Sequence, residues 1–238
     1  MANTFRENIL KILTEYPVAF QEPFKGHPLA NIIRHDFPDS LKNQFEESDR
    51  YIWKGSAGQS RWARAPWLAV FDILITNSAQ SGYYPVYLFR EDFRGVFLSL
   101  NQGVTEIREK YQSEAKDALR AKAADYLAQI GSAPAGFTDV KIDLSPSSPQ
   151  NLSAFYEAGN IFSKFYSIDS IPEDEELIQD MKSMLSNYEL LSYNETVPVG
   201  PGLEDEDEER AQFIEDLRVF RQHKRIDRNA HLAKEVKR

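Results

Sequence analysis

The 238-residue sequence contains no cysteine. This absence excludes disulfide bonds, thiol nucleophiles and cysteine-ligated zinc. No apolar run approaches the length of a membrane span, and the first residues lack the apolar stretch of a signal peptide. We therefore expect a cytoplasmic protein that has no membrane partner.

Motifs for self-contained catalysis are also missing. The four histidines show no His-x-x-x-His or His-Glu-x-x-His spacing, and no carboxylate pattern marks a two-metal nuclease centre. There is no Gly-x-Ser-x-Gly elbow, and Gly55–Ser60 lacks the Gly-Lys-Ser/Thr ending of a phosphate-binding P-loop. We expect no catalytic residue, no metal site and no cofactor in this chain.

An excess of positive charge is absent, since the formal net charge is −9. Acidic residues concentrate in 173–176 and 204–209, whereas 210–238 holds nine Lys and Arg against four Asp and Glu. An acidic protein can still bind DNA when its cations line one surface, so the total charge weakens a nucleic-acid function without excluding it.

The chain has enough apolar residues for a sizeable core, with 42% hydrophobic and 12% aromatic residues. A first helix is predicted with Asn3 as N-cap, followed by short helical turns between prolines. From residue 51 the pattern predicts strands, at Tyr51–Lys54, Ala65–Asp72, Tyr83–Phe89 and Gly95–Leu100.

The polar segment Glu91–Gly95 predicts a hairpin, so the last two of these strands should be antiparallel neighbours. Pro85 should lie in an edge strand or at the start of pairing, because proline has no N–H to donate.

The second half of the chain is mainly helical in pattern. Helices are predicted over Val104–Ile130, over Leu152–Tyr166 and from Pro172, with one short strand at Val140–Leu144. These elements indicate an α+β fold, a small and mainly antiparallel sheet flanked by helices. We expect a domain over residues 1–196, and a linker with a C-terminal helical arm over 197–238.

The loop between the first two strands has the most unusual composition. It offers backbone freedom, small hydroxyls and an amide at Ser56, Gly58, Gln59 and Ser60, followed by the guanidinium groups of Arg61 and Arg64. Such residues can approach phosphates or fill the space that a displaced base leaves. From composition alone, a polar connection with Trp62 in the core is the favoured alternative.

Aromatic residues gather around this loop, and stacked rings can hold an extruded base. They are Trp53, Trp62, Trp67, Tyr83, Tyr84 and Tyr87. Aromatic residues on strands are more often core or cross-strand partners, so this cluster alone does not indicate a binding site.

Four segments together resemble a known family. They are Gly55–Gln59, Ala65–Phe71 with its Pro66-Trp67 pair, Gly82–Phe89 with its Gly-Tyr-Tyr-Pro-Val start, and Leu98–Gly103. In this order, with a long helix behind them, they resemble the N-terminal DNA-binding domain of the McrB restriction factor and its relatives. Phe155–Ile161 and Asn187-Tyr188 extend the resemblance more loosely toward residue 195.

The resemblance implies binding of duplex DNA that carries modified cytosine, typically 5-methylcytosine after a purine, with extrusion of the base into a pocket. By position, Trp67 and Leu88 match pocket residues, and we assign Tyr84 and Tyr156 as further pocket aromatics. Gln59 stands where the family has a tyrosine that assists flipping. Gln59 can fill the vacated stack by hydrogen bonding, but it cannot stack as an aromatic ring does.

The C-terminal stretch Leu217–Asn229, with Leu232–Arg238, resembles the helix that leads into an HNH endonuclease. In such proteins the zinc-binding cysteines and the catalytic histidine follow this helix. We therefore expect that this chain is a binding domain and not an enzyme, and that the parent protein is an HNH restriction endonuclease whose nuclease domain is missing here. A homodimer formed through that missing part is possible.

Two alternatives stay open. A complete nuclease would need a carboxylate and histidine constellation that the sequence does not show. A protein-interaction module of a restriction or defence complex would bind no DNA above background and would expose a large apolar patch.

Overall fold

The computed structural model describes residues 3–45 and 50–196. The helices are α1 (Phe5–Ala19), α2 (Pro28–Arg34), α3 (Asp36–Lys42), α4 (Thr105–Tyr111), α5 (Ala115–Ile130), α6 (Leu152–Gly159) and α7 (Asp174–Thr196). The strands are β1 (Tyr51–Ser56), β2 (Trp67–Asp72), β3 (Tyr83–Phe89), β4 (Gly95–Gln102) and β5 (Phe162–Ser167). Residues up to Leu191 form one structural unit, and the predicted linker and arm, 197–238, lie outside the described residues.

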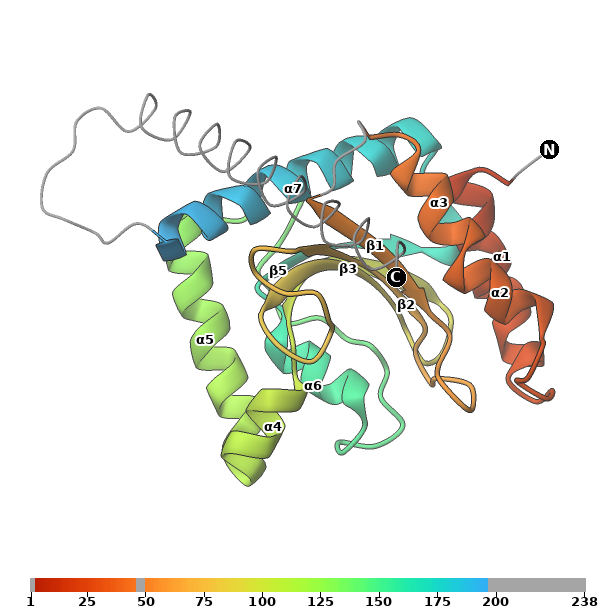
Figure 1. The fold of residues 1–238 in the computed structure, drawn as a ribbon, viewed down its shortest axis with the longest axis horizontal. Coiled ribbons are helices and arrows are strands. Elements are labelled where there is room, and N and C mark those ends of the chain that lie inside the picture. The colour runs from red at the N-terminus through yellow and green to blue at the C-terminus, as the bar shows by residue number, and fades with distance from the viewer. Residues whose placement is uncertain (1–2, 46–49, 197–238) are drawn as a thin grey trace, which may run out of the picture. The chain divides into compact units, whose positions relative to one another are not determined.

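The five strands form one antiparallel sheet, in which they lie in the order of the chain. The predicted α+β class is therefore confirmed, and Glu91–Gly95 connects β3 and β4 as antiparallel neighbours. Figure 1 shows that the sheet is arched and that α6 lies beneath its concave face.

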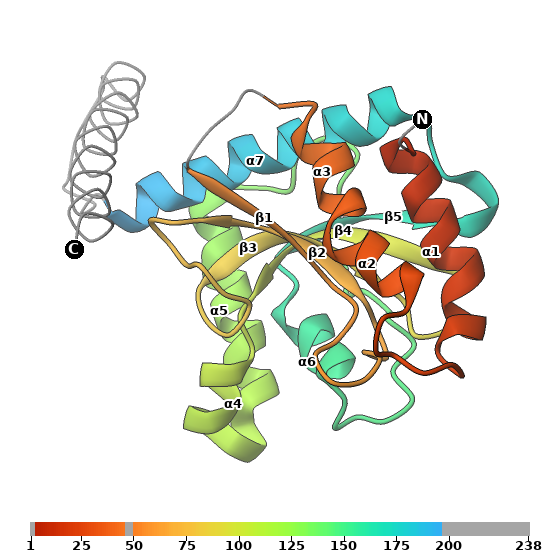
Figure 2. The same ribbon diagram turned by 45° about the vertical axis from the view of Figure 1, so that its right-hand side comes forward.

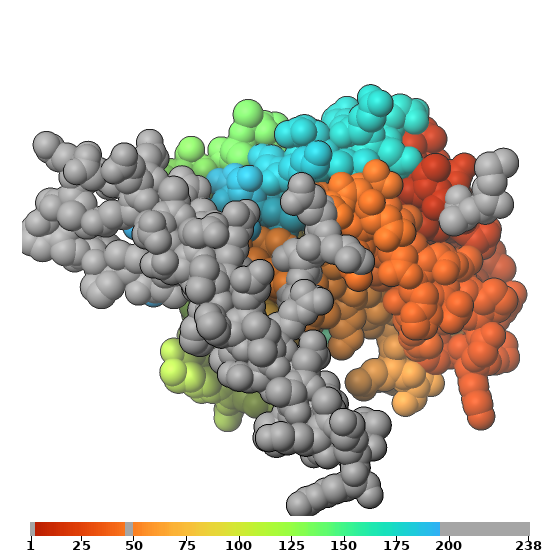
Figure 3. Space-filling model, turned by 45° about the horizontal axis from the view of Figure 1, so that its top comes forward, coloured from red at the N-terminus to blue at the C-terminus, as the bar shows by residue number. Residues whose placement is uncertain are grey.

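Helices α1, α2, α3 and α7 cover the convex face. Phe5 of α1 packs edge-on against Tyr87, and Phe37 of α3 packs against Phe89, with ring centroids 5.1 and 6.0 Å apart. Tyr188 of α7 contacts Tyr83 in the same way, at 5.7 Å. Figure 3 shows α7 beside α1 and α3 on this face. In the described part of the chain, no helix is long and apolar enough to cross a membrane.

Pro85 lies in β3, which is the central strand rather than an edge strand. It pairs with Leu100 of β4, whereas pairing with β2 begins only at the next residue, Val86 opposite Ala69. Pro85, which has no N–H, therefore lies just before pairing between β3 and β2 starts. Of the two positions predicted for Pro85, an edge strand or the start of pairing, the structure shows the second.

The first helix begins one residue later than predicted, with Thr4 instead of Asn3 as N-cap. The Thr4 hydroxyl accepts a bond from the Glu7 backbone N–H at 3.2 Å, and the Glu7 carboxylate accepts one from the Thr4 backbone at 2.8 Å. This reciprocal capping box satisfies two helix-end donors, which a cap at Asn3 would leave to water.

The predicted helix Val104–Ile130 is wrong in one respect, because it is broken at Gln112. This residue has a positive φ of 45°, and a short 3₁₀ turn, η1 (Gln112–Glu114), separates α4 from α5. Tyr111, the last residue of α4 before this break, is 41% exposed. Below it, α5 packs on α6.

The predicted helix Leu152–Tyr166 is wrong beyond Gly159, because Phe162–Ser167 forms strand β5 along the free edge of β4. A helix would bring Phe162 and Phe165 to one face, whereas the strand separates them into a buried ring (0% exposed) and an exposed ring (43%). The predicted strand Val140–Leu144 is absent, and its neighbourhood contributes only a single bridge, between Thr138 and Ser163.

Candidate nucleic-acid interface

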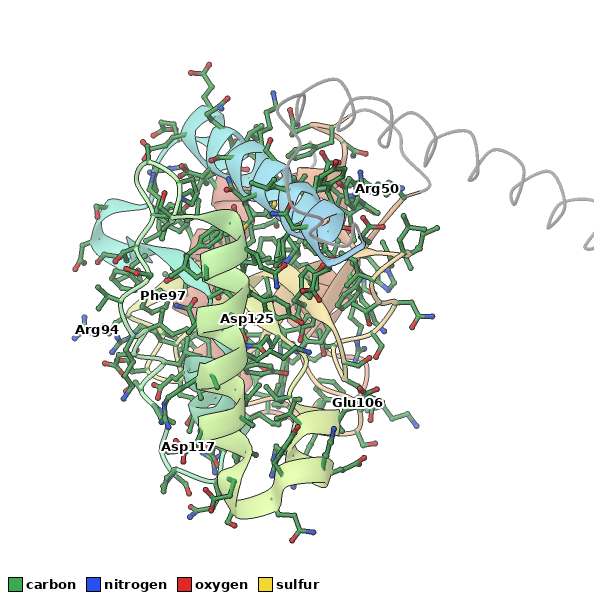
Figure 4. All side chains as sticks on the ribbon, turned by 90° about the vertical axis from the view of Figure 1, so that its left-hand side faces the viewer. Arg50, Arg94, Phe97, Glu106, Asp117 and Asp125 are labelled. Atoms are coloured by element: carbon green, nitrogen blue, oxygen red, sulfur yellow. The ribbon has the colours of Figure 1, made fainter. Side chains whose placement is uncertain are left out.

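A row of five side chains crosses the concave face of the sheet. Directly paired residues of adjacent strands share a face, and the register aligns Ser56, Trp67, Leu88, Phe97 and Phe165. Trp67 and Leu88 are thus immediate neighbours, although they lie 21 residues apart in the chain. Both were predicted to line the base pocket. Phe97, labelled in Figure 4, continues the row toward the β5 edge.

The other two predicted pocket residues lie on the same face. Trp67 contacts Phe71 at 6.4 Å between ring centroids, and Phe71 contacts Tyr84 at 4.9 Å. The backbone carbonyl of Tyr156 accepts a bond from the Asn101 side chain at 3.0 Å, and Asn101 is the register partner of Tyr84. The fold therefore brings all four predicted pocket residues to the concave face.

Exposure differs among these four residues. Leu88 and Tyr84 are each 1% exposed and Tyr156 is 8% exposed, whereas Trp67 is half-buried. A base can reach Leu88 and Tyr84 only after the side chains that cover them move. Of the four predicted pocket residues, Trp67 is therefore the one most accessible from solvent.

Two of the four predicted pocket residues carry phenol hydroxyls, and the hydroxyl of Tyr84 donates to the Ala79 carbonyl at 3.0 Å. Burial raises the pKa of Tyr156 to about 12, and the positive charge of Arg108 lowers the pKa in part. The phenol is therefore neutral at physiological pH and can donate a hydrogen bond. No other described residue makes a hydrogen bond with this hydroxyl.

The predicted flipping loop has a rigid base. Gly58 adopts φ +117°, and a Cβ atom there would lie 2.0 Å from the Arg61 carbonyl oxygen, so only glycine allows this turn to close. The Ala63 N–H donates to the Ala57 carbonyl at 2.7 Å, and the Tyr16 hydroxyl donates to the Ala63 carbonyl at 2.7 Å.

Trp62 anchors this loop to the core. Its indole N–H donates to the Glu22 carbonyl at 2.9 Å, and its ring packs edge-on against Tyr16 and Phe24 at 5.0 Å. The core position considered for Trp62 is confirmed. Beyond this anchor the loop presents an exposed tip, which consists of Gln59, Ser60 and Arg61.

The two arginines predicted to bind phosphates have different surroundings. Arg61 is exposed at the tip. The Arg64 guanidinium donates to the Ser147 hydroxyl at 3.1 Å and lines a cavity of about 250 Å³ together with Glu91 and Asp92. Arg64 is exposed as well, but its guanidinium is engaged by Ser147, so Arg61 at the loop tip is the better placed of the two.

Arg34 joins this group of cations, although no sequence signal connected it with the loop. Its guanidinium donates to the Gly58 carbonyl at 3.1 Å and lies 4.9 Å from the centroid of the Phe24 ring. The residue is exposed on α2, so its charge lies beside the loop tip and remains accessible. Only tertiary packing places it there.

The family model described as MrcB-like, N-terminal domain matches residues 11–193. The chain belongs to this family. The match covers the sheet and all four predicted pocket residues, and it confirms the resemblance at the level of the family. No match was found among curated proteins.

In this MrcB-like domain, the Glu91 carboxylate holds the segment that leads into α6. It accepts bonds from the Ser147 N–H and hydroxyl at 2.9 and 2.7 Å, from the Ser153 hydroxyl at 2.7 Å and from the Asn151 amide at 3.1 Å. Because α6 carries Tyr156, Glu91 of the β3–β4 hairpin fixes the segment that leads to one of the four predicted pocket residues.

Replacing Glu91 with glutamine should destabilise the MrcB-like domain at neutral pH by about 1–2 kcal/mol, because a neutral amide accepts these bonds more weakly. Burial raises the pKa of Glu91, but the bonds from Ser147, Ser153 and Asn151 outweigh burial, so the pKa lies below its usual value of 4.5. A depressed pKa stabilises the fold above the ordinary pKa of glutamate, and this stabilisation disappears as pH falls through the depressed value.

Urea unfolding of wild type and Glu91→Gln between pH 7 and pH 3 should therefore show a difference that shrinks in acid. Glu106→Gln, which changes an exposed carboxylate on α4, serves as the control and should show little difference at any pH. A Glu91→Gln penalty that does not change with pH would contradict the role of the ionised carboxylate.

Within residues 3–45 and 50–196, no group of three or more His, Asp or Glu side chains could hold a metal ion. A second cavity, of about 410 Å³, lies between α5, α6 and residues 139–141 of the MrcB-like domain. It is lined by charges of both signs, including Arg120, Lys141, Asp139 and Glu157, and it contains none of the predicted pocket residues.

Proposed function

We propose that this chain binds duplex DNA containing modified cytosine, with 5-methylcytosine as the first candidate, and receives the extruded base beside Trp67. The proposal rests on one observation above all. Trp67 lies directly opposite Leu88, on the face shared by Tyr84 and Tyr156, and the strand that Trp67 begins follows a loop with an exposed polar tip.

Each group has a defined task in this mechanism. Gln59 at the tip enters the space that the extruded base leaves, while Arg61 and Arg34 hold phosphates on the same side. Trp67 stacks on the base, and the Tyr156 hydroxyl donates to the polar edge of the base. Extrusion costs a few kcal/mol, which stacking worth about 1–3 kcal/mol and edge hydrogen bonds must offset.

Selectivity for the methyl group should be moderate. Burial of one methyl group contributes only about 0.8 kcal/mol, so a pocket that relies on burial alone discriminates weakly against unmodified cytosine. A larger preference requires that the pocket also fit the shape of the modified base.

In the proposed function the chain is the targeting domain of a modification-dependent restriction endonuclease. It recognises the site and does not cleave it, and an HNH nuclease domain of the parent protein supplies cleavage.

A competition binding assay at fixed, moderate salt tests the proposal, because affinities that rest on phosphate contacts depend steeply on salt. One duplex carries a single 5-methylcytosine after a purine, and its twin is unmodified. We expect a clear preference for the modified duplex. Tight but equal binding to both would contradict base recognition, and no binding to either would contradict DNA binding altogether.

The last outcome would favour a protein-interaction module of a restriction complex. One observation supports this second candidate: Ile73 and Leu74, adjacent in the loop after β2, are 45% and 40% exposed. Isolated exposed apolar residues are common on soluble proteins, so this observation carries less weight than the convergence of the pocket residues.

A further inference from the structure

Two cations from different helices lie on one aromatic ring of α6. The Arg108 guanidinium of α4 lies 4.4 Å from the centroid of the Phe155 ring, and the Lys116 ammonium of α5 lies 5.0 Å from it. Phe155 is only partly buried, so this cation–aromatic cluster reaches the surface. A cation over an aromatic ring keeps its charge, and its attraction to the ring restricts the orientation of its side chain.

Among residues 3–45 and 50–196, no carboxylate forms an ion pair with Arg108. Within the described residues, Arg90 and Arg120 form ion pairs with Asp92 and Asp117, whereas Arg108 forms none. Its closest acidic residues along the chain, Glu106 and Glu109, are exposed on α4, and Figure 4 labels the first of them. In the described part of the chain, Arg108 therefore keeps N–H donors that no carboxylate engages, beside the Phe155 ring.

The cluster lies beside the predicted pocket. Phe155 precedes Tyr156 in α6, and the charge of Arg108 acts on the Tyr156 hydroxyl. Figures 1 and 2 show α4 on one side of α6 and the loop after β1 on the other side, below the concave face of the sheet. Cations therefore flank the pocket from both directions, Arg61 and Arg34 on one side and Arg108 with Lys116 on the other.

We propose that Arg108, oriented by Phe155 and supported by Lys116, binds a backbone phosphate next to the extruded nucleotide. A guanidinium presents paired N–H donors that match two phosphate oxygens, and the ring beneath it limits the orientations it must give up on binding. This second phosphate site rests on the proposed function, because it assumes that the pocket beside Tyr156 receives a base.

Arg108→Ala should weaken binding to the modified duplex about tenfold at moderate salt, the size expected for one lost charge-assisted contact. The slope of log affinity against log salt should become shallower by about one unit, because one fewer phosphate is neutralised. Lys110→Ala is the matched control, since it removes one exposed positive charge from the same helix. It should change affinity less than about twofold, as expected for a charge that is not directed at the pocket.

A neutral methylphosphonate, placed in turn at each phosphate beside the modified cytosine, locates the contact. At one of these positions, the methylphosphonate should reduce the affinity of the wild type to that of Arg108→Ala for the unsubstituted duplex. The same methylphosphonate should not reduce the affinity of Arg108→Ala any further. Unchanged affinity of Arg108→Ala for a duplex that the wild type prefers would overturn the phosphate site and leave the proposed function standing. Absence of any preference in the wild type would instead overturn the proposed function.

Folding is controlled by urea unfolding of every variant and by two further substitutions. Arg108→Lys keeps the charge but loses the paired donors, so it should recover affinity only in part. Phe155→Leu removes the ring that orients Arg108, and combined with Arg108→Ala it should add little to the loss of Arg108→Ala alone. Fully additive losses in a folded double variant would overturn the role assigned to the ring.

Discussion

Trp67→Ala should reduce affinity for a duplex with 5-methylcytosine by roughly 10- to 100-fold, the value of one lost base–aromatic stack. Binding to the unmodified duplex should change by less than about threefold, because in the proposed mechanism nonspecific binding depends on phosphate contacts of the loop tip. The difference between the two duplexes is the decisive quantity. It should be measured by fluorescence anisotropy at the same salt concentration for both.

The reason lies in the position of Trp67. It begins β2, directly opposite the buried Leu88, and is itself half-buried, so its ring offers a partly accessible face beside apolar neighbours. An extruded base that stacks there contacts the largest aromatic surface of the site. The other predicted pocket rings, Tyr84 and Tyr156, are more deeply buried.

Trp53→Ala is the matched control. Trp53 is also a half-buried tryptophan, but its side chain lies on the opposite face of the sheet and contacts Phe45 at 5.1 Å between ring centroids. Its loss should affect stability without changing the preference for modified DNA. Equal losses of affinity on both duplexes for Trp67→Ala would show that the base pocket is assigned wrongly.

Arg50→Met should lower the free energy of unfolding by about 3–5 kcal/mol, since it leaves a buried carboxylate without its counter-charge. Stabilities of small domains are typically about 5–15 kcal/mol, so this single change removes a large share of the total. Urea unfolding followed by circular dichroism measures the effect.

Arg50 links the sheet to α7 through charged contacts. Its Nε atom donates to the Asp72 carboxylate at 2.6 Å, and Asp72 is fully buried at the end of β2. A second guanidinium nitrogen donates to Glu189 of α7 at 2.5 Å, and the Tyr51 hydroxyl donates to the same carboxylate at 2.6 Å. Arg50 is labelled in Figure 4.

Arg120→Met provides the comparison, because Arg120 pairs with Asp117 on the exposed surface of α5. Exposed ion pairs of this kind contribute only about 0–1 kcal/mol. Arg50→Met could instead lower the free energy of unfolding no more than Arg120→Met does. This result would mean that Asp72 gains another partner or solvent in the variant, and it would contradict the role of Arg50 as the link between the sheet and α7.

Local patterns in the sequence were sufficient for much of the sheet. The first four strand candidates, the hairpin at Glu91–Gly95 and the start of pairing after Pro85 all depend on residues close together in the chain. Alternation, turn composition and the missing N–H of proline act over a few residues, so they can be recognised without knowing the fold.

The same local reasoning failed where a distant partner decides the structure. Phe162–Ser167 has aromatic residues at a helical spacing, yet it is a strand because the edge of β4 offers it backbone hydrogen bonds. Gln112 has a positive φ that breaks a continuous helical pattern. Glutamine is not a residue type that indicates such a backbone conformation, so the break could not be predicted from the sequence.

For the site, family resemblance indicated Trp67 and Leu88, but it could not show that they are paired residues on the adjacent strands β2 and β3. Composition suggested Arg61 and Arg64 alike, and only the fold shows that Arg64 donates to Ser147 whereas Arg61 lies at the exposed tip of the loop. Arg34 and Arg108 had no sequence signal, because their positions depend on Gly58 and Phe155, which are distant in the chain. The sequence by itself thus determined which residues can stack, turn or carry charge. Tertiary structure decided which of them meet, because contacts between distant residues depend on the packing of the whole sheet and its helices.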